Sequence, residues 1–558
     1  MTHDAVVRYH DGTKHHFHRF APSLGYLDWA SQPHPFRSFD GAPVVPFAAG
    51  EPLSSVPGTY DELGQPVVVL DPGRSRPVSL ATIGELLRYA CGLSAWKQFR
   101  DARWALRVNP SSGNLHPTEV YVAAGPAIGL PATGGVYHYA PDRHVLERRC
   151  TFAADAWRAA CGDPSDACLV VLASIHWREA WKYGERAFRY CQHDLGHAIA
   201  ALRLSAALAG WRAVLQPAWA HRAIAALVGI DRDEDYVDAE PEDPACVMLV
   251  TAGGAGSEAE RGPADGSRRG VDSTALIEAA RRGHWHGRAS QLSEDHVEWT
   301  FIDEVARATE DPGRVVSSVA QIVGSGSGSD VAADRQLDAR ALILQRRSAL
   351  AFDGRSAIDL PRFVRMLSRV MPARCAPWDA LWWTARIHLL LFVHRVEGLE
   401  PGLYLLPRDP AALDRLKAAC GRELLWAPAL DGALPLLCLA RGDCRRTAQR
   451  LSCDQEIAAD GFFSLGMLAD FHASLGDFGP SFYRHLFWES GVVGQVLYLE
   501  AEAAGARATG IGCFYDDPVH DVIGLRDHAF QSLYHFTVGV PVEDTRLTTE
   551  PGYAWEAR

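Results

Sequence analysis

The sequence predicts an α+β fold that occurs twice in one chain. Short runs rich in β-branched and aromatic residues, typical of strands, are mixed with longer stretches in which apolar residues have helical spacing. The segment from Phe188 to Gly210 recurs as Tyr483 to Gly505, with its arginine, its acidic residue, an internal glycine and the final Ala-Gly at a constant offset. Agreement over so long a register indicates an internal duplication.

Length and composition set the number and class of domains. The chain has 558 residues, more than the roughly 250–300 that a single hydrophobic core serves, so two sizeable domains are expected. We place them at residues 1–254 and 331–558, with a linker containing short helical segments at 255–330. Hydrophobic residues make up 47% and charged residues 22% of the chain, which is typical of a globular protein.

Charge and cysteine usage exclude several classes of function. The net charge is −13 and no basic stripe occurs, which argues against nucleic acid or an anionic membrane surface as a partner. No signal-peptide pattern opens the chain and no apolar run approaches the ~18 residues of a membrane span, so we predict a cytoplasmic protein. The 12 cysteines lack metal-ligand spacing, and we expect buried thiols and no metal site.

The first half contains an ordered series of predicted elements. Residues 1–78 are rich in proline, glycine and aromatic residues and predict an extended arm. Ser79 is a plausible N-cap for a helix that begins at Leu80. The long stretch from Phe188 predicts a helix whose small residues would let another helix approach closely. The predicted strands lie at 119–122, 134–139, 167–175 and 246–252.

The segment from Pro110 to Pro117, Pro-Ser-Ser-Gly-Asn-Leu-His-Pro, predicts a hydrogen-bonding loop before the first of these strands. Its two prolines restrict φ at either end and Gly113 allows a tight bend. Ser111, Ser112 and Asn114 offer short polar side chains beside backbone N–H groups. Such a loop suits a flat heterocyclic ligand, and the alternative is an ordinary capped turn.

The second half differs from the first in the residues that carry chemistry. In place of the loop it has Leu381 to His388, where two adjacent tryptophans leave no room for a ring against the backbone. It also has Gln345-Arg346-Arg347-Ser348, which we predict to enter a helix. Guanidinium groups, a hydroxyl and helix N-terminal amides suit a dianionic phosphate. The alternative is an exposed basic start of a helix.

A Lys-Tyr pair precedes the long helix of the first half. Lys182 and Tyr183 have no equivalent in the second half, which carries Gly476-Asp477-Phe478-Gly479-Pro480. A lysine accepts a proton only if burial or like charges lower its pKa, and Arg178 and Arg186 are close in sequence. A solvated lysine beside a helix is the alternative interpretation.

The loop resembles the flavin-binding loop of the nitroreductase-like flavoenzymes, Pro-Ser-x-x-Asn-x-x-Pro. Its Leu-His before the second proline, the upstream Leu106-Arg107 and the opening Tyr9-His10-Asp11-Gly12-Thr13-Lys14 are similar to the SagB/ThcOx branch, the azoline dehydrogenases. The resemblance implies the α+β nitroreductase fold, a mixed or antiparallel sheet flanked by helices. Because that fold is an obligate dimer with FMN at its interface, two copies in one chain imply a covalent pseudo-dimer.

The resemblance also implies roles for individual residues. One composite FMN site would survive, with the ring loop from the first half and the phosphate grip from the second, and the other site would be lost. Gly510-Ile511-Gly512 resembles the glycine segment that brings backbone N–H groups to the flavin N5 edge, and Lys182 with Tyr183 resembles the catalytic pair. The remaining cofactor-binding residues implied in this way are Arg107, Pro110, Ser111, Ser112, Asn114, Arg346, Arg347, Ser348 and Arg546.

The predicted function is that of an FMN-dependent dehydrogenase or oxidase. A hydride would pass from carbon to flavin N5 while Lys182 takes a proton, and dioxygen would reoxidise the flavin. The substrate would be an azoline-like or amine-bearing intermediate of natural-product or modified-peptide biosynthesis, free or bound to a peptide or carrier. Two alternatives stay open: an NAD(P)H-dependent nitro or quinone reductase, and a non-catalytic flavin-binding scaffold subunit. A monomeric pseudo-dimer is expected, with higher oligomers left open.

Overall fold

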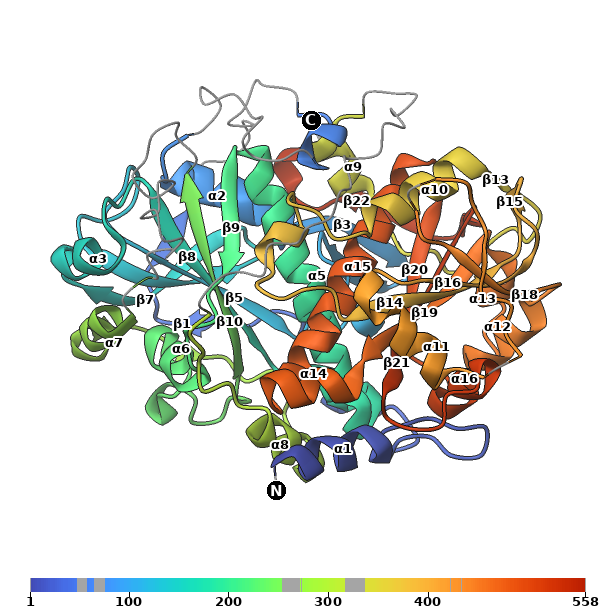
Figure 1. The fold of residues 1–558 in the computed structure, drawn as a ribbon. Helices are drawn as coiled ribbons and strands as arrows, with labels where there is room; N and C mark the ends of the chain where they lie inside the picture. Colours follow the sequence, from blue (N-terminus) through green and yellow to red (C-terminus); the bar gives the residue numbers. More distant parts are fainter. Residues whose placement is uncertain are drawn as a thin grey trace, which may run out of the picture.

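The computed structural model describes residues 2–47, 58–64, 76–252, 271, 273–316, 337–421, 423–432 and 434–556. Two sheets, one from each half of the chain, lie on either side of a central pair of long helices (Figure 1). The largest cluster of buried apolar side chains is continuous across this centre, from Val122 in one sheet to Leu465 in the other. The described parts of the two halves therefore share one core.

The two sheets have the same strand order, and neighbouring strands in both pair antiparallel. The first runs β7 (Val145–Phe152), β6 (Gly134–Ala140), β5 (Thr118–Ala124), β8 (Ala167–Ser174), β10 (Asp243–Ala252), β9 (Trp211–Leu215). The second runs β18 (Leu437–Arg441), β16 (Gly402–Leu406), β14 (Ile387–Val393), β19 (Phe463–Asp470), β21 (Phe530–Gly539), β20 (Arg507–Ile511). The four strands predicted from the first half are confirmed within this order.

The helices repeat in the same way. After β8 come α4 (His176–Tyr183) and the 22-residue α5 (Ala187–Leu208), and after β19 come α14 (Phe471–Phe478) and the 22-residue α15 (Phe482–Ala503). Helices α6 (His221–Val228) and α16 (Asp516–Ile523) then follow β9 and β20. One arrangement thus occurs twice, as the constant offset in the sequence predicts.

Helices α5 and α15 cross at the glycine that the repeat places in each. A Cβ atom on Gly196 would lie 2.2 Å from the carbonyl oxygen of Trp488, and one on Gly491 would lie 2.3 Å from that of His193. Real Cβ atoms do not approach backbone so closely. The close approach of a second helix, predicted from the small residues, is confirmed.

The first 78 residues are only partly the extended arm that the sequence predicts. Residues Thr2–Gly12 form helix α1, which is a correction, because Val6, Tyr9 and His10 lie on one turn-spaced face and are buried. His10 contacts Gln531 and Lys14 pairs with Asp517, so this segment lies on the second half. The predicted helix after Ser79 is α2 (Leu80–Ala90), with a capping box between Ser79 and Thr82.

The terminal and connecting segments pack across the halves. Strand β22 (Thr548–Pro551), near the end of the chain, pairs with β3 (Leu93–Phe99), which pairs with β4 (Ala102–Arg107). Helix α9 (Ala339–Gln345) reaches α2 through Arg340 and Glu85. The domain boundaries predicted at 254 and 331 lie outside the described residues.

The described part of the predicted linker packs against both halves, since Thr309 accepts from Arg484 and Arg314 donates to Ser481 of the second half. It holds α7 (Ser273–Arg282), β11 (His284–Trp285), β12 (Arg288–Ala289) and α8 (Thr300–Ala308), and β11 extends the first sheet beside β7. The remaining helices and short strands are α3 (Ala154–Cys161), α10 (Leu360–Arg369), α11 (Leu413–Ala419), α12 (Arg445–Leu451), α13 (Ile457–Asp460), β1 (Phe39–Asp40), β2 (Val44–Pro46), β13 (Ile358–Asp359), β15 (Val396–Glu397) and β17 (Ala427–Pro428).

Candidate functional site

The loop from Pro110 to Pro117 lies between β4 and β5 and is fastened to helix α5. The backbone N–H and the hydroxyl of Ser112 each donate to Oδ1 of Asp194, at 3.0 Å in both cases. The amide of Asn114 donates to the carbonyl of Ala105 at 2.9 Å, and the hydroxyl of Ser111 accepts from the N–H of His116. The loop is therefore held open by its own polar side chains, with its backbone facing α4 and α5.

Lys182 and Tyr183, at the C-terminal end of α4, meet this loop at Gly113. Gly113 has φ +58°, and a Cβ atom placed on it would lie 2.6 Å from the Tyr183 hydroxyl and 3.2 Å from Lys182 Nζ. The Lys182 side chain is exposed, whereas Tyr183 is half-buried and burial raises its pKa well above the usual value. The Lys182 ammonium and the Tyr183 hydroxyl thus both lie beside the backbone of Gly113.

Two carboxyl groups lie beneath this convergence. Glu179 is fully buried one turn before Tyr183, and neither of its oxygens has a hydrogen-bond partner in the described part of the chain. Burial, and then the neighbouring Asp194, raise the pKa of Glu179 well above its usual range. Burial also raises the pKa of Asp194, to about 7, against the hydrogen bonds from Ser111 and Ser112. Sequence reasoning missed Glu179, whose only signal is its i, i+3 spacing from Lys182.

The raised pKa of Asp194 predicts a pH dependence of stability. Native Asp194 holds its proton up to about pH 7, whereas the unfolded chain releases it near pH ~4. The native state binds more protons in this window, so the free energy of unfolding falls as the pH rises through it. Asp194→Asn should flatten that fall. Urea unfolding of both proteins at about pH 5 and about pH 7.5 measures the effect, and parallel pH trends would contradict it.

Arg346 brings the second half of the chain to the same loop. Its Nε donates to the carbonyl of Val108 at 3.2 Å and its Nη2 to that of Arg107 at 3.3 Å. Its Nη1 is buried without an acceptor among the described residues. A buried guanidinium nitrogen in this state is costly unless an anion satisfies it. Arg346 from the second half thus lies against two residues that come shortly before the loop.

The prediction that Arg346, Arg347 and Ser348 enter a helix is wrong. They follow α9, whose N-cap is Asp338 and whose last residue is Gln345, so no helix N-terminal amides are available there. The guanidinium of Arg347 instead donates to the carbonyls of Leu344 and Arg346, both at 2.7 Å, as cations do at helix C-termini. The Ser348 hydroxyl contacts that of Tyr498 at 2.9 Å.

Two other arginines named from the sequence do not face the loop with free guanidinium groups. Arg107 is buried behind it and donates to the carbonyls of Thr118 and Pro35. Arg546 is exposed and pairs with Asp544 at 2.7 Å, so the structure does not bring it to the site. It was expected there from the resemblance to the flavoenzyme family, and in the structure a local acidic partner satisfies its charge.

The glycine segment of β20 closes the other side of the site. The N–H of Gly510 donates to the Tyr498 hydroxyl at 3.0 Å, and a Cβ atom on Gly512 would lie 2.1 Å from the ring of Tyr190. Ile511 between them is buried. Aromatic side chains from both halves line this side, where His193 stacks on Tyr534 with ring centroids 4.1 Å apart.

These features fit a planar, anionic cofactor. Besides Arg346 Nη1, buried atoms without a partner among the described residues include the Asn109 amide oxygen, the Gln192 amide nitrogen and both ring nitrogens of His193. Buried polar atoms are normally paired, so this concentration next to the loop calls for a polar ligand. Glycine at positions 113 and 512 lets the side chains of Tyr183 and Tyr190 lie directly against the backbone there.

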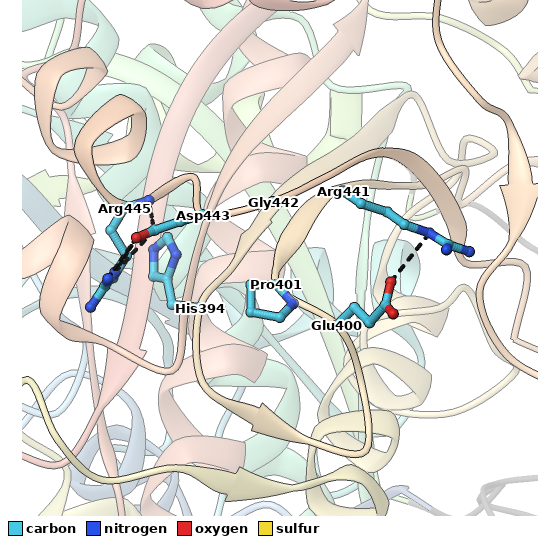
Figure 2. A pocket seen from close by; sticks show the side chains of 7 residues that line it. All are labelled: His394, Glu400, Pro401, Arg441, Gly442, Asp443 and Arg445. Carbon is cyan, nitrogen blue, oxygen red and sulfur yellow. Dashed lines mark hydrogen bonds and ion pairs between the residues drawn. The ribbon is translucent and has the colours of Figure 1, made fainter.

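Two surface cavities lie outside the candidate site described above. Figure 2 shows one of about 570 Å³, where Arg441 pairs with Glu400 and Arg445 with Asp443. The other, of about 480 Å³, lies between residues 34–44 and Glu147. Neither is lined by a residue predicted from the sequence to bind cofactor or substrate. In the first cavity the charges satisfy each other, which leaves little for a charged ligand.

The equivalent position in the second half is filled. Glu489, the counterpart of Asp194, accepts from the N–H groups of Arg386 and Ile387 and from the indole of Trp383, and pairs with Arg408. Trp382 and Trp383 pack against His485 with ring centroids 5.5 and 4.9 Å apart. Aromatic side chains of the second half thus fill the position that corresponds to the loop of the first half.

Comparisons with known proteins agree with this arrangement. Residues 74–240, which include the loop, Lys182 and Asp194 but not Arg346, match the model of the nitroreductase family. A crystal structure from Anabaena variabilis, provisionally named a nitroreductase, matches with a TM-score of 0.66 and 21% identity over 96% of this chain and 99% of that one. The chain has the nitroreductase fold.

A second relative supports the same assignment for the first half. A protein of Methanocaldococcus jannaschii, also provisionally named a nitroreductase, is 27% identical over 144 residues, which are 24% of this chain and 67% of that protein. Among the described residues no helix has both the length and the apolarity to cross a bilayer, and no cluster of three metal-ligating side chains occurs.

Proposed function

We propose that this protein is an FMN-dependent oxidoreductase with a single composite cofactor site. The observation that carries the proposal is the meeting of the Ser112 loop and Lys182, from one half, with Arg346 from the other. Arg346 would neutralise the phosphate, and the Ser112 loop and the glycine segment would hold the ring. When bound, the flavin would supply the hydride acceptor.

The chain's own residues would manage the proton. Lys182 is exposed beside the backbone of Gly113, so a substrate bound there would have to bury it before it could accept a proton from a substrate carbon or nitrogen. The Tyr183 hydroxyl beside it can pass that proton on or orient the substrate. Burial raises the pKa of both Glu179 and Asp194, so a larger share of each stays uncharged and pairs less strongly with Lys182.

The proposed substrate is an azoline-like or amine-bearing intermediate of natural-product or modified-peptide biosynthesis, with dioxygen as the electron acceptor. An exposed Lys182 supports a substrate that approaches from solvent and is attached to a peptide or carrier. Rapid bleaching of the flavin by NADPH would instead support a nitro or quinone reductase. A colourless protein that purifies with a partner would support a scaffold subunit.

Arg346→Ala tests the cofactor site. Loss of a charge-assisted contact worth about 1.5–3 kcal/mol should weaken FMN binding by about 10- to 100-fold. FMN per chain, measured by visible absorption after dialysis, should fall accordingly. Arg546→Ala removes an exposed arginine of the same charge and should bind FMN as the wild type does. Full occupancy in Arg346→Ala, with unchanged thermal unfolding, would overturn the assignment.

A further inference from the structure

Two cysteines from separate segments of the second half lie side by side near the candidate site. Cys453 follows helix α12, and Cys513 follows Gly512 at the end of β20. Their sulfur atoms are 2.8 Å apart. Both residues are half-buried, so a small thiol or disulfide can approach them from solvent. Disulfide formation needs a sulfur–sulfur distance of about 2.05 Å, so only a small local movement separates the two thiols from a bond.

The two backbones that carry these thiols are tied together. The side-chain amide of Gln455 donates to the carbonyl of Ser452 at 2.8 Å and to that of Cys513 at 3.1 Å. The N–H of Tyr515 donates to the carbonyl of Leu451 at 2.8 Å. Hydrogen bonds on both sides of the pair therefore hold the two segments in register.

The surroundings distinguish the two sulfurs. A hydrogen bond joins the sulfur atoms of Cys453 and Cys513, and this bond together with the His15 imidazole lowers the pKa of Cys513 to about 5 against the cost of burial. His15 Nδ1 accepts from the N–H of Ala21, which leaves Nε2 to carry the proton toward the sulfur. The pKa of Cys453 is raised, with the hydrogen bond to Cys513 as the largest cause. Cys513 is thus the nucleophilic thiolate and Cys453 the resolving thiol.

We propose that Cys453 and Cys513 form a redox-active dithiol that is oxidised by low-molecular-weight disulfides. The Cys513 thiolate attacks one sulfur of the small disulfide, which forms a mixed disulfide and releases one thiolate. The Cys453 thiol then loses its proton and attacks the Cys513 sulfur, which forms the internal disulfide and releases the second small thiol. Two electrons pass from the cysteine pair to the small disulfide, so two cysteine thiols and one disulfide give one internal disulfide and two small thiols.

The position of the pair connects it to the candidate site. Gly512, whose backbone packs against Tyr190, precedes Cys513, and its carbonyl accepts from Arg186 at 3.3 Å. Arg186 lies between Lys182 and helix α5 and also pairs with Asp516. Cys513, one of the two cysteines that would be oxidised, is therefore the residue next to the glycine segment. The proposal does not depend on whether flavin binds there.

The test is oxidation of the purified full-length protein by oxidised glutathione, followed by peptide mapping under non-reducing conditions. The wild type should form a Cys453–Cys513 crosslink before glutathione is found on any other cysteine, and dithiothreitol should reverse it. Cys453→Ser retains a hydroxyl donor and should stop at a glutathione adduct on Cys513. Cys513→Ser should react at least 10-fold more slowly at Cys453.

Matched controls are available in the same chain. Cys161 and Cys444 are also half-buried, but burial raises the pKa of each thiol to about 12. Cys444→Ser should form the crosslink at the wild-type rate, and neither Cys161 nor Cys444 should be modified on that timescale. Absence of the crosslink, or equal reaction rates for Cys513→Ser and the wild type, would overturn the proposal.

Discussion

Gly491→Ala should cost the protein about 4 kcal/mol or more of its free energy of unfolding. The new methyl group would lie 2.3 Å from the carbonyl oxygen of His193 and 2.8 Å from the Cα of Gly196. These are backbone atoms of a helix, so they cannot relieve the clash by a change of rotamer as a side chain could. The helices α5 and α15 would have to separate, which opens the core that the two halves share.

The measurement is urea or thermal unfolding of the variant beside a matched control. Gly476→Ala places the same methyl group on an exposed position of α14, where nothing lies within 4 Å. That control should be neutral or more stable by about 0.5–1 kcal/mol, because alanine favours helix over glycine. A loss below about 1 kcal/mol in Gly491→Ala would show that the crossing is looser than described.

Lys182→Ala should reduce turnover by about 10²- to 10⁴-fold and leave the cofactor content unchanged. Lys182 Nζ approaches the loop backbone at Gly113, and no other lysine is brought to that point in the described residues. Its ammonium makes no ion pair with another described residue and lies 5.2 Å from the centroid of the Tyr183 ring. The variant should therefore fold normally, and the loss should lie in the chemical step.

Single-turnover flavin reduction by the substrate and FMN stoichiometry together measure this prediction. Lys417→Ala removes an exposed lysine on α11 and should turn over at the wild-type rate. Tyr183→Phe retains the ring but not the hydroxyl, so its turnover measures the contribution of the Tyr183 hydroxyl separately from that of Lys182. Wild-type turnover in Lys182→Ala with full FMN content would refute a role for this lysine in proton transfer.

The repeat and the strands could be predicted from the sequence because they depend on local pattern. Buried strands such as 167–174 are continuous apolar runs, and the glycine in each long helix has the same offset as its neighbours. The loop was also predictable, since Pro110, Gly113 and Pro117 restrict its backbone. Each of these signals lies within one segment.

Other features depend on partners far apart in the chain and could not be predicted. The end of α9 at Gln345 is set by its packing on the first half and by carbonyls that Arg347 caps, whereas the sequence suggested that a helix begins there. Glu179 looked like an ordinary helix-surface acid, and only its burial next to Asp194 reveals an unusual carboxyl group. Cys453 and Cys513 are 60 positions apart and meet only in the fold.

Each half of the chain holds a terminal segment of the other. Helix α1 and the residues that follow it contact the second half through His10 and Lys14. Strand β22 of the second half pairs with β3 of the first half. If the chain were cleaved between residues 316 and 337, the two polypeptides should therefore remain associated. A single chain ensures that the two halves are made in equal amounts. The exchanged terminal segments hold the halves together.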